Sequence, residues 1–305
     1  MKYIRLADNV PEVSVIGIGC MRIASKDKKD VENIIRTALD NGINFFDHAD
    51  IYGGGRSEEI FGEVLKDDPS LRNKMVIQSK CGINKGMYDF SKEHIMKAVN
   101  GSLKRLNVDC IDSLLLHRPD VLMDLSQVKE AFSELYESGK VKSFGVSNMN
   151  RFQIELLQSV LPYPITSDQL QLSLAHTPLI DEGINVNTGW DNGIVRASGT
   201  LEYLKLKDIT LQTWSPLQFG MFQGIFIDNE NYGELNEQLH KLADKYGVTK
   251  DTIAYSWLLR LTQKVQVITG TTTTDRIINA ARAADVELSA REWYDLYKAA
   301  GNRLP

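Results

Sequence analysis

The chain of 305 residues has few cysteines and no arrangement that would make them structural. Cys20, Cys81 and Cys110 are odd in number and far apart, and none belongs to a Cys-x-x-Cys pair. This pattern argues against a disulfide-stapled scaffold and against a thiolate metal site. It is typical of a protein from a reducing compartment, so we expect a cytoplasmic location.

The sequence also lacks long apolar runs and clusters of basic residues. No apolar stretch is long enough to cross a bilayer. The first residues, MKYIRLADNVPEV, contain neither the apolar segment nor the cleavage site of a signal peptide. The formal net charge of -5 and the absence of a Lys/Arg block argue against a polyanionic partner. We therefore expect no membrane and no nucleic-acid partner, and the sequence does not set the oligomeric state.

What the sequence does contain is a repeated alternation of strand-like and helix-like segments. Apolar residues spaced i, i+3, i+4, i+7 and i+8 from Val31 to Leu39 indicate one of the helices, which ends at Gly42. Several strand-like runs are apolar on both faces, as in buried parallel strands. The eight runs are Val13–Gly19, Ile43–Asp47, Met75–Lys80, Cys110–His117, Val141–Asn148, Thr166–Leu172, Ile209–Ser215 and Val265–Gly270.

Eight strand–helix repeats in 305 residues predict an α/β fold of the (β/α)8 TIM-barrel type, built as a single domain over residues 1–305. Two short segments before the repeats, Lys2–Leu6 and Val10–Ser14, predict an N-terminal β-hairpin. A doubly wound sheet is the alternative. It requires a G-x-G-x-x-G turn after the first strand, but Gly17-Ile18-Gly19 is followed by Arg22 at the position of the third glycine.

Titratable side chains stand at the ends of successive predicted strands. Asp47 ends the second strand, Lys80 the third and His117 the fourth, and Tyr52 follows Asp47 closely. Because barrel chemistry takes place at the C-terminal ends of the strands, we expect these residues to meet at one mouth. Each of them alone is compatible with a structural role. Their occurrence together predicts a catalytic site.

These residue types suit proton transfer to an oxygen atom. A tyrosine titrates at about pH 10, and a neighbouring ammonium lowers that pKa. A buried lysine needs a carboxylate to keep its charge. We therefore predict that Tyr52 is a general acid, that Lys80 and Asp47 tune it, and that His117 orients a carbonyl group. A reduction of this kind needs a hydride from a cofactor.

A phosphate site is predicted after the last strand. In TGTTTTDR, residues 269–276, Gly270 lets the backbone approach a phosphate, the threonines offer donors and Arg276 offers a planar charge. An ordinary threonine-rich helix start with a surface arginine is the alternative. Trp214, at the end of the seventh strand, is placed to stack on a nicotinamide ring, and a buried core aromatic is its alternative.

At these residues the sequence resembles the aldo-keto reductase superfamily, and within it the bacterial general oxidoreductases, over essentially its whole length. The family motif Phe-Asp-x-Ala-x-x-Tyr-Gly stands here at residues 46–53, and QSKCG and LLLHRPD carry the matching Lys80 and His117. The resemblance implies reduction of an aldehyde or ketone with NADP(H) and without a metal. It implies that the catalytic residues are Asp47, Tyr52, Lys80 and His117. It implies the following cofactor contacts: Gly19, Met21, Arg22, Ser147, Asn148, Gln169, Trp214, Ser215, Pro216, Leu217, Gly220, Gly270, Thr271, Thr272, Thr273, Arg276 and Asn279.

Some features depart from the family pattern or leave a function open. Asn279-Ala280 stands where the family often has Glu-Asn, whereas Arg276 is retained and favours NADPH over NADH. The segment Leu217–Gly224 is expected to fold over the pyrophosphate as a lid. His48 is expected to hydrogen-bond a neighbouring loop. Two other functions stay open, namely a Schiff-base lyase that uses Lys80 and a cofactor-binding regulatory protein with slow turnover.

Overall fold

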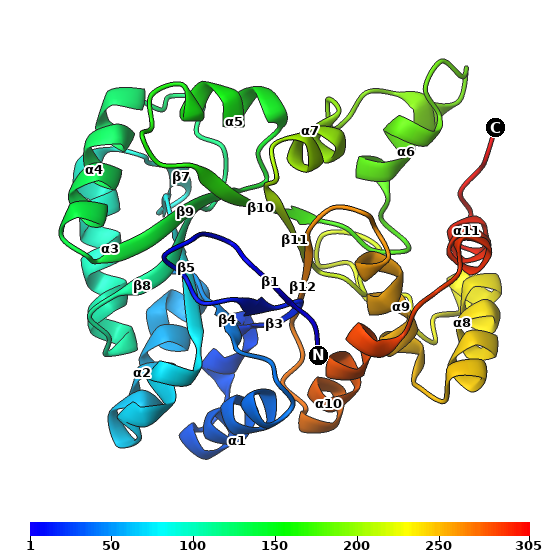
Figure 1. The fold of residues 1–305 in the computed structure, drawn as a ribbon, viewed down its shortest axis with the longest axis horizontal. Coiled ribbons are helices and arrows are strands. Elements are labelled where there is room, and N and C mark those ends of the chain that lie inside the picture. The colour runs from blue at the N-terminus through cyan, green and yellow to red at the C-terminus, as the bar shows by residue number, and fades with distance from the viewer.

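The computed structural model describes residues 1–305 and shows a closed barrel ringed by helices (Figure 1). Its eight strands are parallel and follow the order β10-β11-β12-β3-β4-β5-β8-β9 around the barrel. They are β3 (Ile16–Gly19), β4 (Phe45–Asp47), β5 (Val76–Cys81), β8 (Ile111–Leu116), β9 (Val141–Ser147), β10 (Ile165–Gln171), β11 (Thr210–Trp214) and β12 (Val265–Thr269). The predicted (β/α)8 fold is confirmed.

The helices fill the connections between the strands and surround the barrel (Figure 1). The α-helices are α1 (Lys28–Asp40), α2 (Arg56–Asp67), α3 (Lys92–Leu106), α4 (Leu125–Glu137), α5 (Arg151–Gln158), α6 (Pro178–Ile184), α7 (Thr200–Leu206), α8 (Gly233–Tyr246), α9 (Lys250–Leu259), α10 (Thr274–Arg282) and α11 (Ala290–Ala299). Short 3-10 helices are η1 (Cys20–Ser25), η2 (Tyr52–Gly55), η3 (Pro69–Lys74), η4 (Asp191–Gly193), η5 (Glu230–Tyr232) and η6 (Ala283–Asp285). None of the helices is both long and apolar enough to span a membrane.

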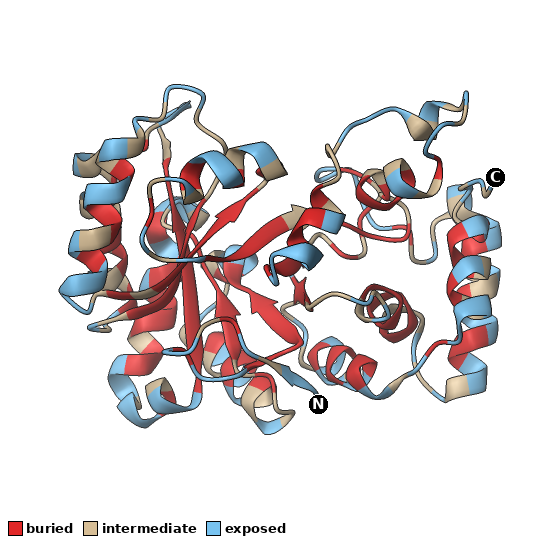
Figure 2. Cartoon of the chain, turned by 45° about the horizontal axis from the view of Figure 1, so that its top comes forward, coloured by how far each residue is buried: buried red, intermediate tan, exposed pale blue.

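Capping side chains and apolar stripes explain where the helices begin and which face they bury. Ser91 accepts the backbone N–H of His94 at the start of α3, and capping boxes begin α5 and α11. On α1 the predicted stripe from Val31 to Leu39 faces the core, with Leu39 partly buried and its other members buried. Figure 2 shows the same division, with buried strands and helices that are buried on one face and exposed on the other.

The predicted N-terminal hairpin is present. It includes Val13 and Ser14, which were predicted to begin the first barrel strand. Its strands β1 (Tyr3–Ile4) and β2 (Val13–Ser14) pair antiparallel. The expected strand Val13–Gly19 is interrupted after Ser14, so β3 begins only at Ile16. The interruption coincides with two hydrogen bonds of Ser14. Ser14 donates its backbone N–H to the Asn44 side chain at 2.8 Å and its hydroxyl to the Ile16 carbonyl at 2.6 Å.

The hairpin closes the N-terminal end of the barrel. Leu6, Val10 and Val13 pack in a small apolar cluster with Phe45, Val76 and Ile268 from the barrel strands. The main apolar core lies between the strands and the helices. A second small hairpin, β6 (Ile83–Asn84) and β7 (Met87–Tyr88), follows β5 at the other end. The C-terminal end of the barrel is therefore the end at which a site can form.

Candidate active site

A buried ion pair between Asp47 and Lys80 lies at the C-terminal end of the barrel. Asp47 is the last residue of β4, and Lys80 lies in the neighbouring strand β5. The Lys80 Nζ atom is 2.7 Å from each carboxylate oxygen of Asp47. It also donates to the His48 carbonyl oxygen at 2.8 Å and lies 3.2 Å from the Tyr52 hydroxyl oxygen. Three of the four predicted catalytic side chains are thus in direct contact.

The ion pair and the burial together set the protonation states. Burial alone would lower the pKa of Lys80, but the charge of Asp47 and the oxygen of Tyr52 outweigh it and raise that pKa above 10.5. For Tyr52 the balance is the reverse. Burial raises its pKa above 10.0 even though the Lys80 ammonium lowers it. The expected lowering by Lys80 is present, but burial has the larger effect, so the pKa of Tyr52 is raised overall and Tyr52 holds its proton at neutral pH.

His117 completes the group of predicted catalytic residues. It follows β8 directly, and its ring meets the Tyr52 ring edge-on, with centroids 5.9 Å apart and an interplanar angle of 81°. Its Nδ1 atom is buried and has no hydrogen-bond partner. Burial, with smaller contributions from Lys80 and Arg118, lowers the pKa of His117 well below 6.5. The imidazole is therefore neutral at pH 7.

Two glutamine side chains hold Asp47 from inside the barrel. Gln78 of β5 and Gln169 of β10 each donate from Nε2 to the Asp47 Oδ1 atom, at 2.7 Å and 3.1 Å. Both glutamines are almost fully buried. The Gln169 amide, for which the family resemblance implies a contact to nicotinamide, thus donates to the Asp47 carboxylate in this structure.

These glutamines continue as a chain across the barrel interior, which we call the glutamine chain: Gln78, Gln169, Gln212 and Gln266. Gln78 and Gln169 donate to Gln212 Oε1 at 2.8 Å and 3.2 Å. Gln212 donates to Gln266 at 2.9 Å, and Gln266 donates to the Ser14 carbonyl at 2.8 Å. Barrel interiors are usually filled by branched apolar side chains. The glutamine chain was not predicted, and its only signal in the sequence is a glutamine inside four of the predicted strands.

Four of the predicted cofactor residues are linked beside His117. Trp214, at the end of β11, donates its indole N–H to the Asn148 Oδ1 atom at 3.0 Å. The Asn148 amide in turn donates to the Ser147 hydroxyl oxygen at 2.8 Å, and that hydroxyl donates to the Gln169 carbonyl at 2.9 Å. Asn148 has a positive φ of 61°. The ends of β9 and β11 are therefore joined through side chains at the mouth.

The other predicted cofactor residues follow three strands. Gly19, Met21 and Arg22 follow or end β3, and the group from Gly270 to Asn279 follows the adjacent strand β12. Ser215, Pro216, Leu217 and Gly220 lie in the loop after β11. Because β11, β12 and β3 are neighbours in the barrel, these three groups lie at one side of the mouth.

The start of α10 has the features that a phosphate needs. No side chain caps the helix, so the N–H groups of its first turn are free. No atom lies within 4 Å of the position that a Cβ would occupy on Gly270, which leaves the backbone open to a ligand. Arg276 is exposed and forms no ion pair. The residues present therefore fit the phosphate of a dinucleotide.

Two residues of the β4–η2 connection differ from expectation or were missed. The His48 ring is fully buried, packs edge-on against Phe61 with centroids 4.6 Å apart, and has no hydrogen-bond partner on either nitrogen. The expected hydrogen bond to a loop is wrong, because burial lowers the pKa of His48 to about 3 and the neutral ring packs as an aromatic group. Asp50 was missed. Burial, with the charge of Glu58, raises the pKa of Asp50 to about 7.

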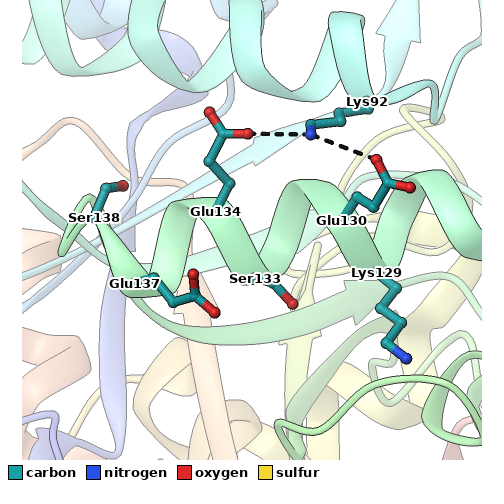
Figure 3. Close-up of a pocket in the computed structure, with 7 residues that line it drawn as sticks. All are labelled: Lys92, Lys129, Glu130, Ser133, Glu134, Glu137 and Ser138. Atoms are coloured by element: carbon teal, nitrogen blue, oxygen red, sulfur yellow. Dashed lines mark hydrogen bonds and ion pairs between the residues drawn. The ribbon is translucent and has the colours of Figure 1, made fainter.

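A cavity of about 590 Å³ lies away from this mouth, between α3 and α4 (Figure 3). It has no apolar lining residue. Lys92 pairs there with Glu130 at 3.4 Å and with Glu134 at 3.2 Å, as the dashed lines in Figure 3 show. This hollow is a surface ion-pair groove and contains none of the predicted site residues. No three His, Cys, Asp or Glu side chains are grouped as a metal site.

Comparison with known proteins agrees with the motifs. Residues 15–300 match the Aldo/keto reductase family. Oxidoreductase YdhF of Escherichia coli (strain K12) is 34% identical in an alignment of 311 positions, gaps included, that covers 98% of each chain. The 6-dehydroglucose reductase of Agrobacterium fabrum is 34% identical in an alignment of the same length that covers 97% of each chain.

The fold is shared with a solved enzyme as well. The crystal structure of an aldo-keto reductase from Klebsiella pneumoniae in complex with NADPH matches with a TM-score of 0.76 at 22% identity, covering 94% of this chain and 91% of that one. The structural likeness supports the barrel, and the family match and the two bacterial relatives extend over almost the whole sequence. The chain therefore belongs to the aldo/keto reductase family of oxidoreductases.

Proposed function

We propose that this protein is an NADP(H)-dependent oxidoreductase that reduces an aldehyde or a ketone to an alcohol. The observation that carries the proposal is the contact of the Tyr52 hydroxyl with the buried Lys80–Asp47 pair, 3.2 Å from the ammonium. His117 lies beside this hydroxyl, at the open end of the barrel. A proton donor, its tuning cation and a neutral hydrogen-bonding group thus face one position.

Each residue has a distinct task in this proposal. Tyr52 donates its proton to the carbonyl oxygen as the carbonyl carbon is reduced. Lys80 stabilises the tyrosinate that remains, and Asp47 keeps Lys80 charged despite its burial. His117, neutral at pH 7, hydrogen-bonds the carbonyl oxygen. When bound, NADPH supplies the hydride, so that cofactor is oxidised to NADP⁺ as the carbonyl compound becomes an alcohol.

The proposed cofactor site uses the side of the mouth formed by β11, β12 and β3. The start of α10 and Arg276 would hold phosphate groups, and Trp214 would pack against the nicotinamide ring. Ser147 and Asn148 would bind the carboxamide. The complex of the Klebsiella pneumoniae aldo-keto reductase with NADPH supports the choice of this dinucleotide.

A Schiff-base lyase is disfavoured by the state of Lys80. An attacking amine must be uncharged and must reach the substrate. The Lys80 side chain is instead enclosed by Asp47, the His48 carbonyl and Tyr52, and its pKa is raised. A regulatory protein with slow turnover would use the same cofactor site. The rate of NADPH consumption distinguishes it from the proposed reductase.

The test is the consumption of NADPH with 4-nitrobenzaldehyde, followed at 340 nm. We expect Tyr52→Phe to lower kcat by at least about 100-fold, because it removes the proton donor, while the Kd for NADPH changes little. Tyr88→Phe is the matched control, since this exposed tyrosine on β7 also stands at the mouth and forms no hydrogen bond. Undiminished turnover by Tyr52→Phe would contradict the role of Tyr52. Binding of NADPH without turnover by any variant would favour the regulatory function.

A further inference from the structure

Arg118 is an arginine at the mouth of the barrel without an anionic partner. It follows His117 directly and is only partly exposed. Its guanidinium contacts the Met221 sulfur, with Nη2 to Sδ at 3.8 Å, and lies over the Trp214 ring, with Cζ 5.8 Å from the centroid. Neither contact neutralises its charge. A guanidinium has five donors in a planar fork, so most of them are unused.

The nearest acid in the sequence does not serve Arg118. Asp120 accepts the backbone N–H of Leu122 at 2.8 Å and forms no ion pair with the guanidinium. Fully buried charged groups are almost always paired. Arg72 and Arg105, for example, each bind a buried carboxylate at 2.8 Å. The guanidinium of Arg118 has no such partner and is therefore free to bind an anionic ligand.

Arg118 follows a strand opposite the one that leads into the proposed phosphate site. In the closed barrel three strands lie between β8 and β12 in either direction, so these two strands are opposite each other. Arg22 and Arg276, which are also unpaired, follow the adjacent strands β3 and β12. Arg118 follows β8. Its backbone is therefore opposite the start of α10, and its guanidinium extends across to Trp214 and Met221 on the β11 side of the mouth.

The surroundings of Arg118 are apolar and aromatic. Met221 and Phe222 are 54% and 62% exposed, and the Phe222 ring lies 6.5 Å from the Trp214 ring, centroid to centroid. These side chains offer contact area to an apolar group that carries an anion. A carboxylate, which is planar and singly charged, matches the guanidinium fork with two parallel hydrogen bonds.

We propose that Arg118 is an anion-binding subsite and that the substrate is an aldehyde or ketone that carries a carboxylate on an apolar frame. The inference rests on the proposed function, since the carbonyl faces Tyr52 and His117 while the carboxylate reaches Arg118. The Arg118 charge then selects among carbonyl compounds and takes no part in the chemical step.

The test compares 4-carboxybenzaldehyde with its neutral methyl ester. We expect kcat/KM of the wild type to favour the acid by about tenfold or more, and Arg118→Met to bring the ratio close to one. Arg303→Met is the matched control. Its guanidinium also lies 5.8 Å from a tryptophan centroid, that of Trp190, but in the C-terminal tail. Arg303→Met should keep the wild-type ratio. Equal kcat/KM values for acid and ester in the wild type would overturn the proposal.

Binding of the alcohol products separates this inference from the proposed function. Calorimetry with 4-(hydroxymethyl)benzoate and its methyl ester, with and without NADP⁺, needs no turnover. Tighter binding of the acid that depends on Arg118, with neither aldehyde reduced, would support the subsite and contradict the reductase function. Reduction of both aldehydes that needs Tyr52 but shows no preference for the acid would support the reductase function and overturn the subsite.

Discussion

Asp50 lies between Asp47 and Tyr52 in the chain, and its Oδ1 atom is buried without a hydrogen-bond partner. Burial and the charge of Glu58 raise its pKa from 3.8 to about 7. The folded protein therefore binds this proton more tightly than the unfolded chain does. The sign follows from proton linkage: stability falls as the pH rises from about 4 to about 7, and the lost stability is not regained above that range.

Asp50→Asn removes this titration. We expect the variant to be more stable than the wild type at pH 8, by roughly 5 °C in Tm, and the difference to shrink toward pH 5. Thermal unfolding followed by circular dichroism over this pH range gives the comparison. Two Tm curves that run parallel from pH 5 to pH 8 would show that the pKa of Asp50 is not raised in the folded protein.

Helix packing depends on a glycine at the crossing of α2 and α3. A Cβ on Gly62 would lie 2.0 Å from the Arg105 carbonyl oxygen and 2.7 Å from the Leu106 carbonyl carbon. Gly62→Ala must push the helices apart, which we expect to cost about 3 kcal/mol. Gly233→Ala in α8 is the control, because nothing lies within 4 Å of its Cβ position. Urea unfolding should show a large loss for Gly62→Ala, and equal stabilities of the two variants would refute the close contact.

Between the strands, the glutamine chain fixes the position of Asp47. Gln78→Leu has a similar size but removes the 2.7 Å hydrogen bond to the carboxylate. We expect kcat for aldehyde reduction to fall about tenfold and its dependence on pH to change, with little effect on the Kd for NADPH. Gln266→Leu removes a member of the chain that does not touch Asp47.

These two variants separate positioning from stability. Both lose buried hydrogen bonds and should lose Tm, whereas only Gln78→Leu should alter the pH profile of kcat. A matching loss of kcat in Gln266→Leu, or an unchanged profile in Gln78→Leu, would mean that the chain serves stability alone.

The elements were largely readable from the sequence, because buried parallel strands give continuous apolar runs. The exception is the break after Ser14, which depends on the side chain of Asn44, distant in the sequence. Apolar periodicity cannot report such a contact. The strand end at Asp47 was placed correctly, and those at Lys80 and His117 were placed within one residue, since β5 continues to Cys81 and β8 ends at Leu116.

At the scale of the whole molecule, closure of the barrel brings distant residues together. Asp47, Lys80 and His117 come from β4, β5 and the end of β8, and the N-terminal hairpin covers the opposite end. The glutamine chain was not predictable. It joins β5 to β11, which are not neighbours. The stagger of the strands decides which interior side chains lie at the same height along the barrel axis and can touch. The raised pKa of Tyr52 also follows from burial in the closed barrel, which the local sequence does not contain.

The transfer of deuterium from cofactor to product tests the proposed reaction most directly. The wild type is mixed with NADPH dideuterated at C4 of the nicotinamide and with 4-nitrobenzaldehyde, and the product is analysed by mass spectrometry. We expect an alcohol with one deuterium on the carbinol carbon from the wild type, and almost none of it from Tyr52→Phe. An alcohol without deuterium, or no alcohol from a wild type that binds the cofactor, would contradict carbonyl reduction by this protein.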